Sequence, residues 1–191
     1  MIEKNDRSDD WEGVSILCQA LDTAFKYESE SLVAGKSILE MGFCTGLPSV
    51  FSLTNRAAHV TLFSMEEIIM NDCVKPTLAR NKVKPTQKRL IFGEFSDLRK
   101  STDQNRFDII LASEYLNTDK FSYEELHDII DYLLTPDGLC IFSSRMSYFH
   151  HEGKFIDLIK VKGKFDVFER WSSPKSDFVQ RKVIQLTRVI R

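Results

Sequence analysis

The stretch Ser37–Phe51, SILEMGFCTGLPSVF, has the pattern of a buried strand, a glycine turn and the start of a helix. Gly42 and Gly46 mark the turn, and Pro48 suits a first helical turn, where its missing N–H had no intrahelical partner anyway. Glycines let a backbone approach a ligand closely, and a helix N-terminus offers unpaired N–H groups. The stretch therefore predicts the nucleotide-binding corner of a doubly wound sheet. A tight strand–helix connection without a ligand is the alternative, because Cys44 replaces the middle glycine of a G-x-G-x-G turn.

Working outward from this stretch, strand and helix patterns alternate along the chain. Helical patterns cover residues 11–32, 66–81 and 124–134, and Pro76 is predicted to kink the second of them. An acidic turn and a polar loop are expected within residues 93–106. The expected strands are Ser37–Met41, His59–Phe63, Arg89–Phe92, Phe107–Ser113, Leu139–Ser143, Lys164–Trp171 and Val179–Val189.

The order of these elements predicts the fold class. The run FDIILAS at Phe107–Ser113 is nearly all apolar, as in a strand of a parallel sheet covered on both faces. Right-handed crossovers make the first five strands parallel, and the closing hairpin inserts one antiparallel strand. We therefore expect an α/β fold: a doubly wound, Rossmann-like, seven-stranded and mostly parallel sheet with a C-terminal antiparallel hairpin.

The composition fits one globular domain. The chain has 191 residues, of which 42% are apolar, so it can bury a sizeable core. We expect residues 1–10 to form a flexible N-terminus and residues 11–191 a single domain. The 26 basic and 28 acidic residues nearly balance, which argues against a large nucleic-acid footprint.

The sequence shows no targeting or membrane signal. The first ten residues, MIEKNDRSDD, lack the apolar segment of a secretory signal, and no apolar run approaches membrane-spanning length. The cysteines form no C-x-x-C pair and sit among apolar residues at Cys18, Cys44, Cys73 and Cys140. These features predict a reducing compartment, the cytoplasm and also the nucleus, and no membrane partner.

Several polar residues are candidates for a site. Ser113 and Glu114 end a central strand, where open α/β sheets bind their ligands, so we expect a site role for at least one of them. Glu66, after the second strand, either binds ribose hydroxyls or only favours the N-terminus of the next helix. His150 and His151 are adjacent, so their side chains point apart. We interpret them as a surface loop and predict no metal site.

The segments together resemble the seven-strand S-adenosylmethionine-dependent methyltransferases, and within them most closely the protein histidine methyltransferases. LEMGFCTGLPS resembles the family motif L-D-L-G-C-G-S-G-L, GEFSDL resembles G-E-W-S, and FDIILASEYLN resembles Y-D-L-I-L-T-S-E-T-I-Y-N. Glu12-Gly13, NDCVKPTLARN and SSRMSYF match further family segments. The resemblance runs from about Glu12 to the C-terminus.

The resemblance implies S-adenosylmethionine as cofactor and N-methylation of a histidine in a protein substrate, with a ribosomal protein as one candidate and a monomeric enzyme. Glu40 would meet the cofactor ammonium, and Phe95 would stack on the adenine. No catalytic acid or base is identified, since a neutral imidazole is already nucleophilic near pH 7. The implied cofactor residues are Glu40, Gly42, Phe43, Gly46, Ser64, Met65, Glu66, Phe95 and Ser113, and the implied substrate residues are Glu114 and Tyr115.

Four positions depart from the family pattern. Cys18 and Gln19 replace a tryptophan-glutamate pair, Cys44 replaces the second motif glycine, and Ser64 stands where the family has an acid. Loss of charged acceptors and crowding of the turn predict weak cofactor binding, at about 10⁻⁴ M. A non-catalytic protein-binding module with the same fold, and methylation of lysine instead of histidine, are the alternatives.

Overall fold

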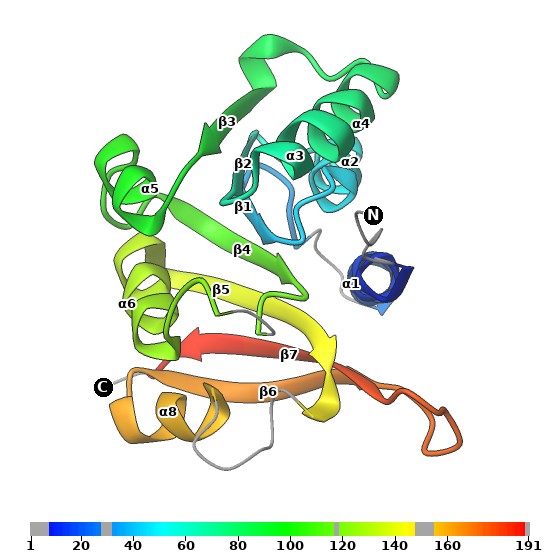
Figure 1. Cartoon of the computed structure of the whole chain (residues 1–191), viewed down its shortest axis with the longest axis vertical. Coiled ribbons are helices and arrows are strands. Elements are labelled where there is room, and N and C mark those ends of the chain that lie inside the picture. The colour runs from blue at the N-terminus through cyan, green and yellow to red at the C-terminus, as the bar shows by residue number, and fades with distance from the viewer. Residues whose placement is uncertain (1–7, 28–31, 117–118, 148–154, 190–191) are drawn as a thin grey trace, which may run out of the picture.

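The computed structural model describes residues 8–116, except 28–31, together with residues 119–147 and 155–189. Its helices are α1 Ser8–Tyr27, α2 Leu47–Thr54, α3 Glu67–Ile69, α4 Lys75–Arg80, α5 Phe95–Ser101, α6 Tyr123–Leu133 and α8 Phe155–Lys162, with a π-helical turn at Met70–Val74 and a 3₁₀ turn at Pro85–Gln87. Its strands are β1 Ser37–Gly42, β2 His59–Ser64, β3 Lys88–Phe92, β4 Phe107–Ser113, β5 Leu134–Arg145, β6 Phe165–Ser172 and β7 Arg181–Arg188 (Figure 1).

The strands form one seven-stranded sheet with the order β3-β2-β1-β4-β5-β7-β6. The pairs from β3 to β5 are parallel, and β7 lies antiparallel between β5 and β6. The predicted fold class is therefore confirmed. The chain turns outward in both directions from β1 and β4, so the switch point of the sheet lies between these two strands, where such folds bind ligands.

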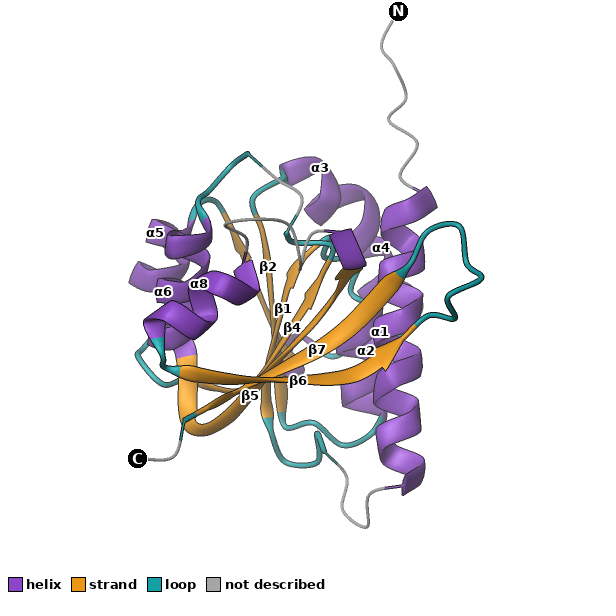
Figure 2. Cartoon of the chain, turned by 90° about the horizontal axis from the view of Figure 1, so that it is seen from below, coloured by secondary structure: helices purple, strands orange, loops and turns teal. Residues whose placement is uncertain are grey.

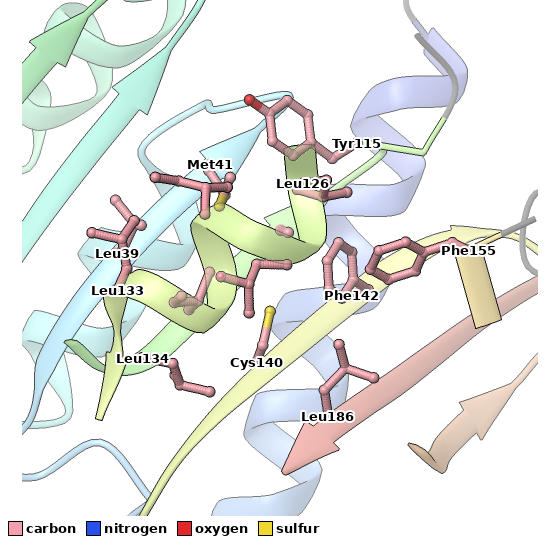
Figure 3. Packing of buried hydrophobic residues seen from close by; sticks show 14 of the residues in the cluster. Leu39, Met41, Tyr115, Leu126, Leu133, Leu134, Cys140, Phe142, Phe155 and Leu186 are labelled. Carbon is pink, nitrogen blue, oxygen red and sulfur yellow. The ribbon is translucent and has the colours of Figure 1, made fainter. Parts of the chain in front are cut away.

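Helices cover both faces of the sheet, as Figure 2 shows. One face packs against α5, α6 and α8, and part of its core appears in Figure 3. The other face packs against α1, α2 and the α3–α4 segment. Alternating strand residues divide between the faces: Leu39 and Met41 join the first cluster and Ile38 the second, the period expected of a pleated strand.

The predicted interruption before Pro76 is confirmed. The expected helix 66–81 divides into α3, a widened π-helical turn and α4, which starts one residue before this proline. Proline has no N–H to donate, and its ring would clash with the carbonyl of Asp72 in a regular α-helix. The wider turn immediately before it accommodates both defects.

Several boundaries differ from the expectation. Strand β5 begins at Leu134, not at Leu139, and pairs there with Phe107 before a register shift. The acidic turn expected at residues 93–97 is the start of helix α5, where the Asp97 carboxylate accepts a hydrogen bond from the Glu94 amide at 3.0 Å. This is a capping box in a helix too short to show apolar periodicity. Within the described residues helix α1 covers Ser8–Tyr27, and Leu32, where the expected helix ended, lies in a turn. No helix in the described ranges is long and apolar enough to cross a membrane.

Candidate active site

The carboxyl ends of β1, β4 and β5 form a stepped edge at the switch point. Gly42 pairs with Ser113 in the parallel register, and the Phe43 amide donates to the Ser113 carbonyl at 2.7 Å. One strand further, the Glu114 amide donates to the Ser143 carbonyl at 2.8 Å. Backbone hydrogen bonds thus continue past the ends of the regular strands and fix where each following side chain emerges.

Gly42 is required at this edge for a steric reason. Its φ is +89°, and a Cβ on it would lie 2.3 Å from the Ser113 carbonyl oxygen. Gly46 has φ +83° and caps the N-terminus of α2, but a Cβ there would meet Thr77 at 3.4 Å and the Val74 carbonyl oxygen at 3.6 Å, which is ordinary contact. The first glycine therefore closes the step between two strands, and the second turns the chain into the helix.

The Glu40 carboxylate is directed into the glycine turn. Its Oε1 accepts from the Thr45 and Gly46 amides at 2.9 and 2.8 Å, and its Oε2 accepts from the Ser49 amide at 2.9 Å. Burial raises the pKa of this carboxyl, and the hydrogen bonds from the turn oppose that rise. We expected Glu40 to meet the cofactor ammonium; the structure instead gives this 1% exposed side chain the task of holding the turn.

The backbone amides of the turn donate their hydrogen bonds to acceptors within the protein. Besides the three on Glu40, the Cys44 amide donates to Gly42 at 2.7 Å and the Leu47 amide to Thr45 Oγ1 at 3.3 Å. The expected row of unpaired N–H groups at the start of α2 is thus wrong, because the buried carboxylate takes the place of an external anion. The turn fits a ligand without phosphates better than a nucleotide phosphate.

Ser64 and Glu66 form a tight corner after β2. The buried Ser64 hydroxyl accepts from the Glu66 amide and donates to the Glu66 carbonyl, both at 3.0 Å. The Glu66 carboxylate forms an ion pair with Lys120 at 3.1 Å and stays one-third exposed. Met65 packs against the core. The corner is therefore built by Ser64, and Glu66 holds its charged group at the edge.

An aromatic cluster lies beside this corner. The ring of Phe95 stacks on Phe63 at 6.0 Å between centroids and contacts the rings of Tyr115 and Phe121 at 6.1 and 4.9 Å. The Tyr115 hydroxyl is buried and has no hydrogen-bond partner among the described residues. Figure 3 shows Tyr115 at one end of the drawn part of the cluster. Burial raises the pKa of this phenol well above its usual value, so it is a neutral donor.

Glu114 occupies the outermost position of the stepped edge. It has φ +47°, its side chain is 4% exposed, and it forms an ion pair with Arg181. The Ser144 hydroxyl donates to its Oε2 at 3.2 Å. Sequence reasoning missed Arg181, because a single arginine at the start of a late strand carries no signal of its own. The Glu12-Gly13 match was the available hint, since Arg181 also binds Glu12.

The residues present fit S-adenosylmethionine. A close backbone approach at Gly42, an unpartnered buried donor at Tyr115 and a half-buried ring at Phe95 surround one edge of the sheet. The structure brings together the predicted residues on β1, β4 and the two following turns. It places Gln19 on the exposed side of α1. His150 and His151 lie outside the described residues, and within the described ones no three His, Cys, Asp or Glu side chains gather as a metal site.

The position of the Cys44 side chain argues against the expected crowding of the turn. Its side chain is fully buried in the apolar cluster under α1, with Sγ 3.9 Å from the Glu40 carbonyl. Burial raises the pKa of this thiol well above its usual value. The thiol therefore fills part of the apolar core next to the turn.

Replacing Ser64 with aspartate is expected to tighten binding of S-adenosylhomocysteine about tenfold, whereas Cys44→Gly is expected to give no gain. A carboxylate adds charge-assisted hydrogen bonds worth roughly 1.5–3 kcal/mol, against about 1 for a neutral one. It can still accept from the Glu66 amide, as the serine does. Isothermal titration calorimetry of both variants measures the difference. A tighter Cys44→Gly variant with an unchanged Ser64→Asp variant would contradict this assignment.

The strand order, the closing hairpin and the glycine turn at Gly42 between β1 and α2 define a Rossmann-like methyltransferase fold. A sequence model of the lysine methyltransferase family matches residues 9–162, and the chain belongs to that family. An uncharacterised Caenorhabditis elegans protein is 38% identical over 96% of this chain and 77% of its own length. A histidine protein methyltransferase 1 homologue of Dictyostelium discoideum is 27% identical over 75% of this chain and 47% of its own.

A solved structure supports the same fold. A Burkholderia thailandensis 1,6-didemethyltoxoflavin-N1-methyltransferase, crystallised with S-adenosylhomocysteine, aligns at a TM-score of 0.69 with 16% identity, over 97% of this chain and 82% of that one. The predicted class of S-adenosylmethionine-dependent methyltransferase is confirmed by family and fold. Specificity for histidine stays a prediction.

Proposed function

We propose that this protein is an S-adenosylmethionine-dependent methyltransferase that methylates a nitrogen atom of a protein side chain. The observation that carries the proposal is the unpartnered, buried hydroxyl of Tyr115, which follows by two residues the Ser113 that pairs with Gly42 at the switch point. A buried hydrogen-bond donor without a partner is costly, and a bound ligand relieves that cost. Family membership supports S-adenosylmethionine as the cofactor.

The residues of the edge mainly position the reactants. When bound, S-adenosylmethionine supplies an electrophilic methyl group, and in-line transfer depends on placing a nitrogen lone pair behind it. The backbone at Gly42 and Phe43 would hold the amino-acid end of the cofactor, and Phe95 would contact its adenine. Tyr115 would donate a hydrogen bond, and Glu114 would face the incoming side chain. Helix α1 packs against this edge, where the Ser143 hydroxyl donates to the Gly13 carbonyl, and would exclude water from it.

Histidine is the substrate residue that the motif likeness favours. The Dictyostelium relative carries a histidine methyltransferase name, and LASE and GEFS resemble motifs of such enzymes. A neutral imidazole needs no proton removal before attack. An edge without a dedicated base therefore suffices for this substrate.

Lysine is the second candidate, favoured by the family name and by Glu114. A lysine ammonium must lose a proton before its nitrogen can attack a methyl group. Burial raises the pKa of Glu114 to about 7, against the lowering effect of Arg181, and a carboxylate in this range can accept that proton.

Two measurements test the proposal. Calorimetric titration with S-adenosylhomocysteine should show weak binding, near 10⁻⁴ M. Incubation of the protein with tritiated S-adenosylmethionine and a ribosomal protein fraction, followed by acid hydrolysis, should yield labelled methylhistidine or methyllysine, with excess S-adenosylhomocysteine as the control. Low micromolar binding would show that the sequence departures do not weaken the site. No binding, even by Ser64→Asp, would favour the non-catalytic module.

The proposal has three further parts: the substrate is a ribosomal protein, the enzyme is a monomer, and it is located in the cytoplasm and the nucleus. The first rests on family resemblance alone. The hydrolysis experiment tests it directly, since label confined to non-ribosomal proteins would replace it. Size-exclusion chromatography with light scattering tests the monomer.

A further inference from the structure

The contacts around Glu114 join segments that lie far apart in the sequence. Arg181, at the start of β7, binds the Glu114 carboxylate through Nη1 and donates from Nε to the Glu12 carboxylate at 3.1 Å. The side chains of Arg181 and Glu114 are 1% and 4% exposed, while that of Glu12 is 56% exposed. One guanidinium thus bridges a buried acid of the sheet edge and a solvent-exposed acid of α1.

Helix α1 rests directly on the same carboxylate. A Cβ on Gly13 would lie 2.2 Å from Glu114 Oε1, so only glycine leaves room at this position of the helix. The Ser143 hydroxyl donates to the Gly13 carbonyl at 2.8 Å and fixes the helix over the edge. Both Glu114 oxygens are engaged, one by Arg181 and the other by Ser144.

The backbone of Glu114 is held in a conformation that a glutamate rarely adopts. Its φ of +47° lies in the left-handed region, which costs a non-glycine residue of the order of 1–3 kcal/mol and persists only where surrounding contacts over-determine it. Three contacts hold it: the ion pair with Arg181, the hydrogen bond from the Ser144 hydroxyl, and the hydrogen bond from the Glu114 amide to the Ser143 carbonyl.

We propose that Arg181 is a positioning residue for methyl transfer, which holds the Glu114 carboxylate in one orientation at the stepped edge and couples that orientation to the first turns of α1. The inference rests on the proposed function, in which Glu114 faces the incoming side chain. A purely structural ion pair is the alternative; removing one partner of such a buried pair destabilises the fold because the other charge is left uncompensated.

The charges around Glu114 make its titration a direct reporter of this coupling. Burial raises the pKa of Glu114 most, and Asp10 of α1 adds to the rise; Arg181 of β7, the Ser144 hydrogen bond and Arg145 of β5 lower it. An opposite charge within hydrogen-bond distance lowers the pKa of a carboxyl by about one to three units. Removing Arg181 should therefore raise the pKa of Glu114 by that amount.

Arg188→Met is the matched control for Arg181→Met. Arg188 lies at the other end of β7, where it pairs with Asp131 and donates to the Leu134 carbonyl at 2.9 Å. Both changes remove an ion-paired arginine of one strand, but only Arg181 contacts Glu114. The pKa of Glu114 can be followed by ¹³C NMR on the full chain labelled at glutamate, where the Glu114 signal is the one that disappears in Glu114→Gln. We expect this pKa to rise in Arg181→Met and not in Arg188→Met.

Transfer kinetics separate positioning from folding. With the protein substrate identified by the tritium experiment, Arg181→Met should lose about tenfold or more in kcat and shift the pH profile of kcat. Its affinity for S-adenosylhomocysteine should stay unchanged within about twofold. Arg181→Lys should recover part of the loss in kcat. If Arg181→Met does not fold, Glu12→Gln, at an exposed side chain, should lower the pKa of Glu114 and also reduce kcat. An unchanged titration or pH profile in folded variants of a competent enzyme overturns this inference alone. A wild-type chain that neither binds nor transfers overturns the function with it.

Discussion

Replacing Gly42 with alanine is expected to abolish cofactor binding and to lower the free energy of unfolding by roughly 3 kcal/mol or more. The left-handed φ of +89° costs an L-residue about 1–2 kcal/mol. The added Cβ would also lie 2.3 Å from the Ser113 carbonyl oxygen, which is backbone and cannot rotate away. The step between β1 and β4 must then open, with loss of the Phe43–Ser113 hydrogen bond, worth about 1 kcal/mol.

Gly35→Ala is the matched control for this change. Gly35 has a similar φ of +71°, but no atom lies within 4 Å of a Cβ built on it. Its replacement should show the backbone cost of about 1–2 kcal/mol alone and leave binding intact. Urea unfolding and calorimetric titration measure both effects. Equal losses of stability in the two variants would show that the contact with Ser113 is not the cause.

Replacing Glu40 with alanine is expected to cost roughly 3–5 kcal/mol of stability and to disorder the glycine turn. The carboxylate accepts from three amides, at Thr45, Gly46 and Ser49, at 2.8 to 2.9 Å. Each buried N–H left without an acceptor costs about 1–3 kcal/mol, less where water enters. Binding of S-adenosylhomocysteine should be lost as well, because the turn that approaches the ligand no longer has a fixed shape.

Glu40→Gln distinguishes a structural acceptor from a cofactor ligand. Glutamine keeps the shape and one acceptor oxygen for Thr45 and Gly46, but its NH₂ group would face the Ser49 amide, so the loss should be about 1–3 kcal/mol. If Glu40 only holds the turn, the affinity of the folded Gln variant for S-adenosylhomocysteine should fall less than about threefold. A loss of tenfold or more in a folded Gln variant would instead restore the expected contact with the cofactor ammonium.

Local patterns were sufficient to predict the architecture. The nearly continuous apolar run at residues 107–113 predicted a covered parallel strand, and the β-prone C-terminal segment predicted the closing hairpin. Right-handed crossovers explain why the first five strands are parallel, whereas the order of the strands in the sheet is known from the structure alone. Helix α5 was not predicted, because seven residues with few apolar positions show no helical periodicity. Its capping box, Glu94 and Asp97, was the signal in the sequence that could have indicated it.

For the candidate site, too, part of the arrangement could be predicted from the sequence and part could not. The sequence by itself determined that Gly42, Ser113 and Glu114 lie at one edge of the sheet, since carboxyl ends of parallel strands meet there. Only the tertiary structure decided where their side chains point: Glu40 into the turn, Cys44 into the core, and Arg181 onto Glu114 across 67 residues of sequence. Strand position follows from local periodicity, whereas hydrogen-bond partners of a buried charge depend on whichever distant segment packs against it.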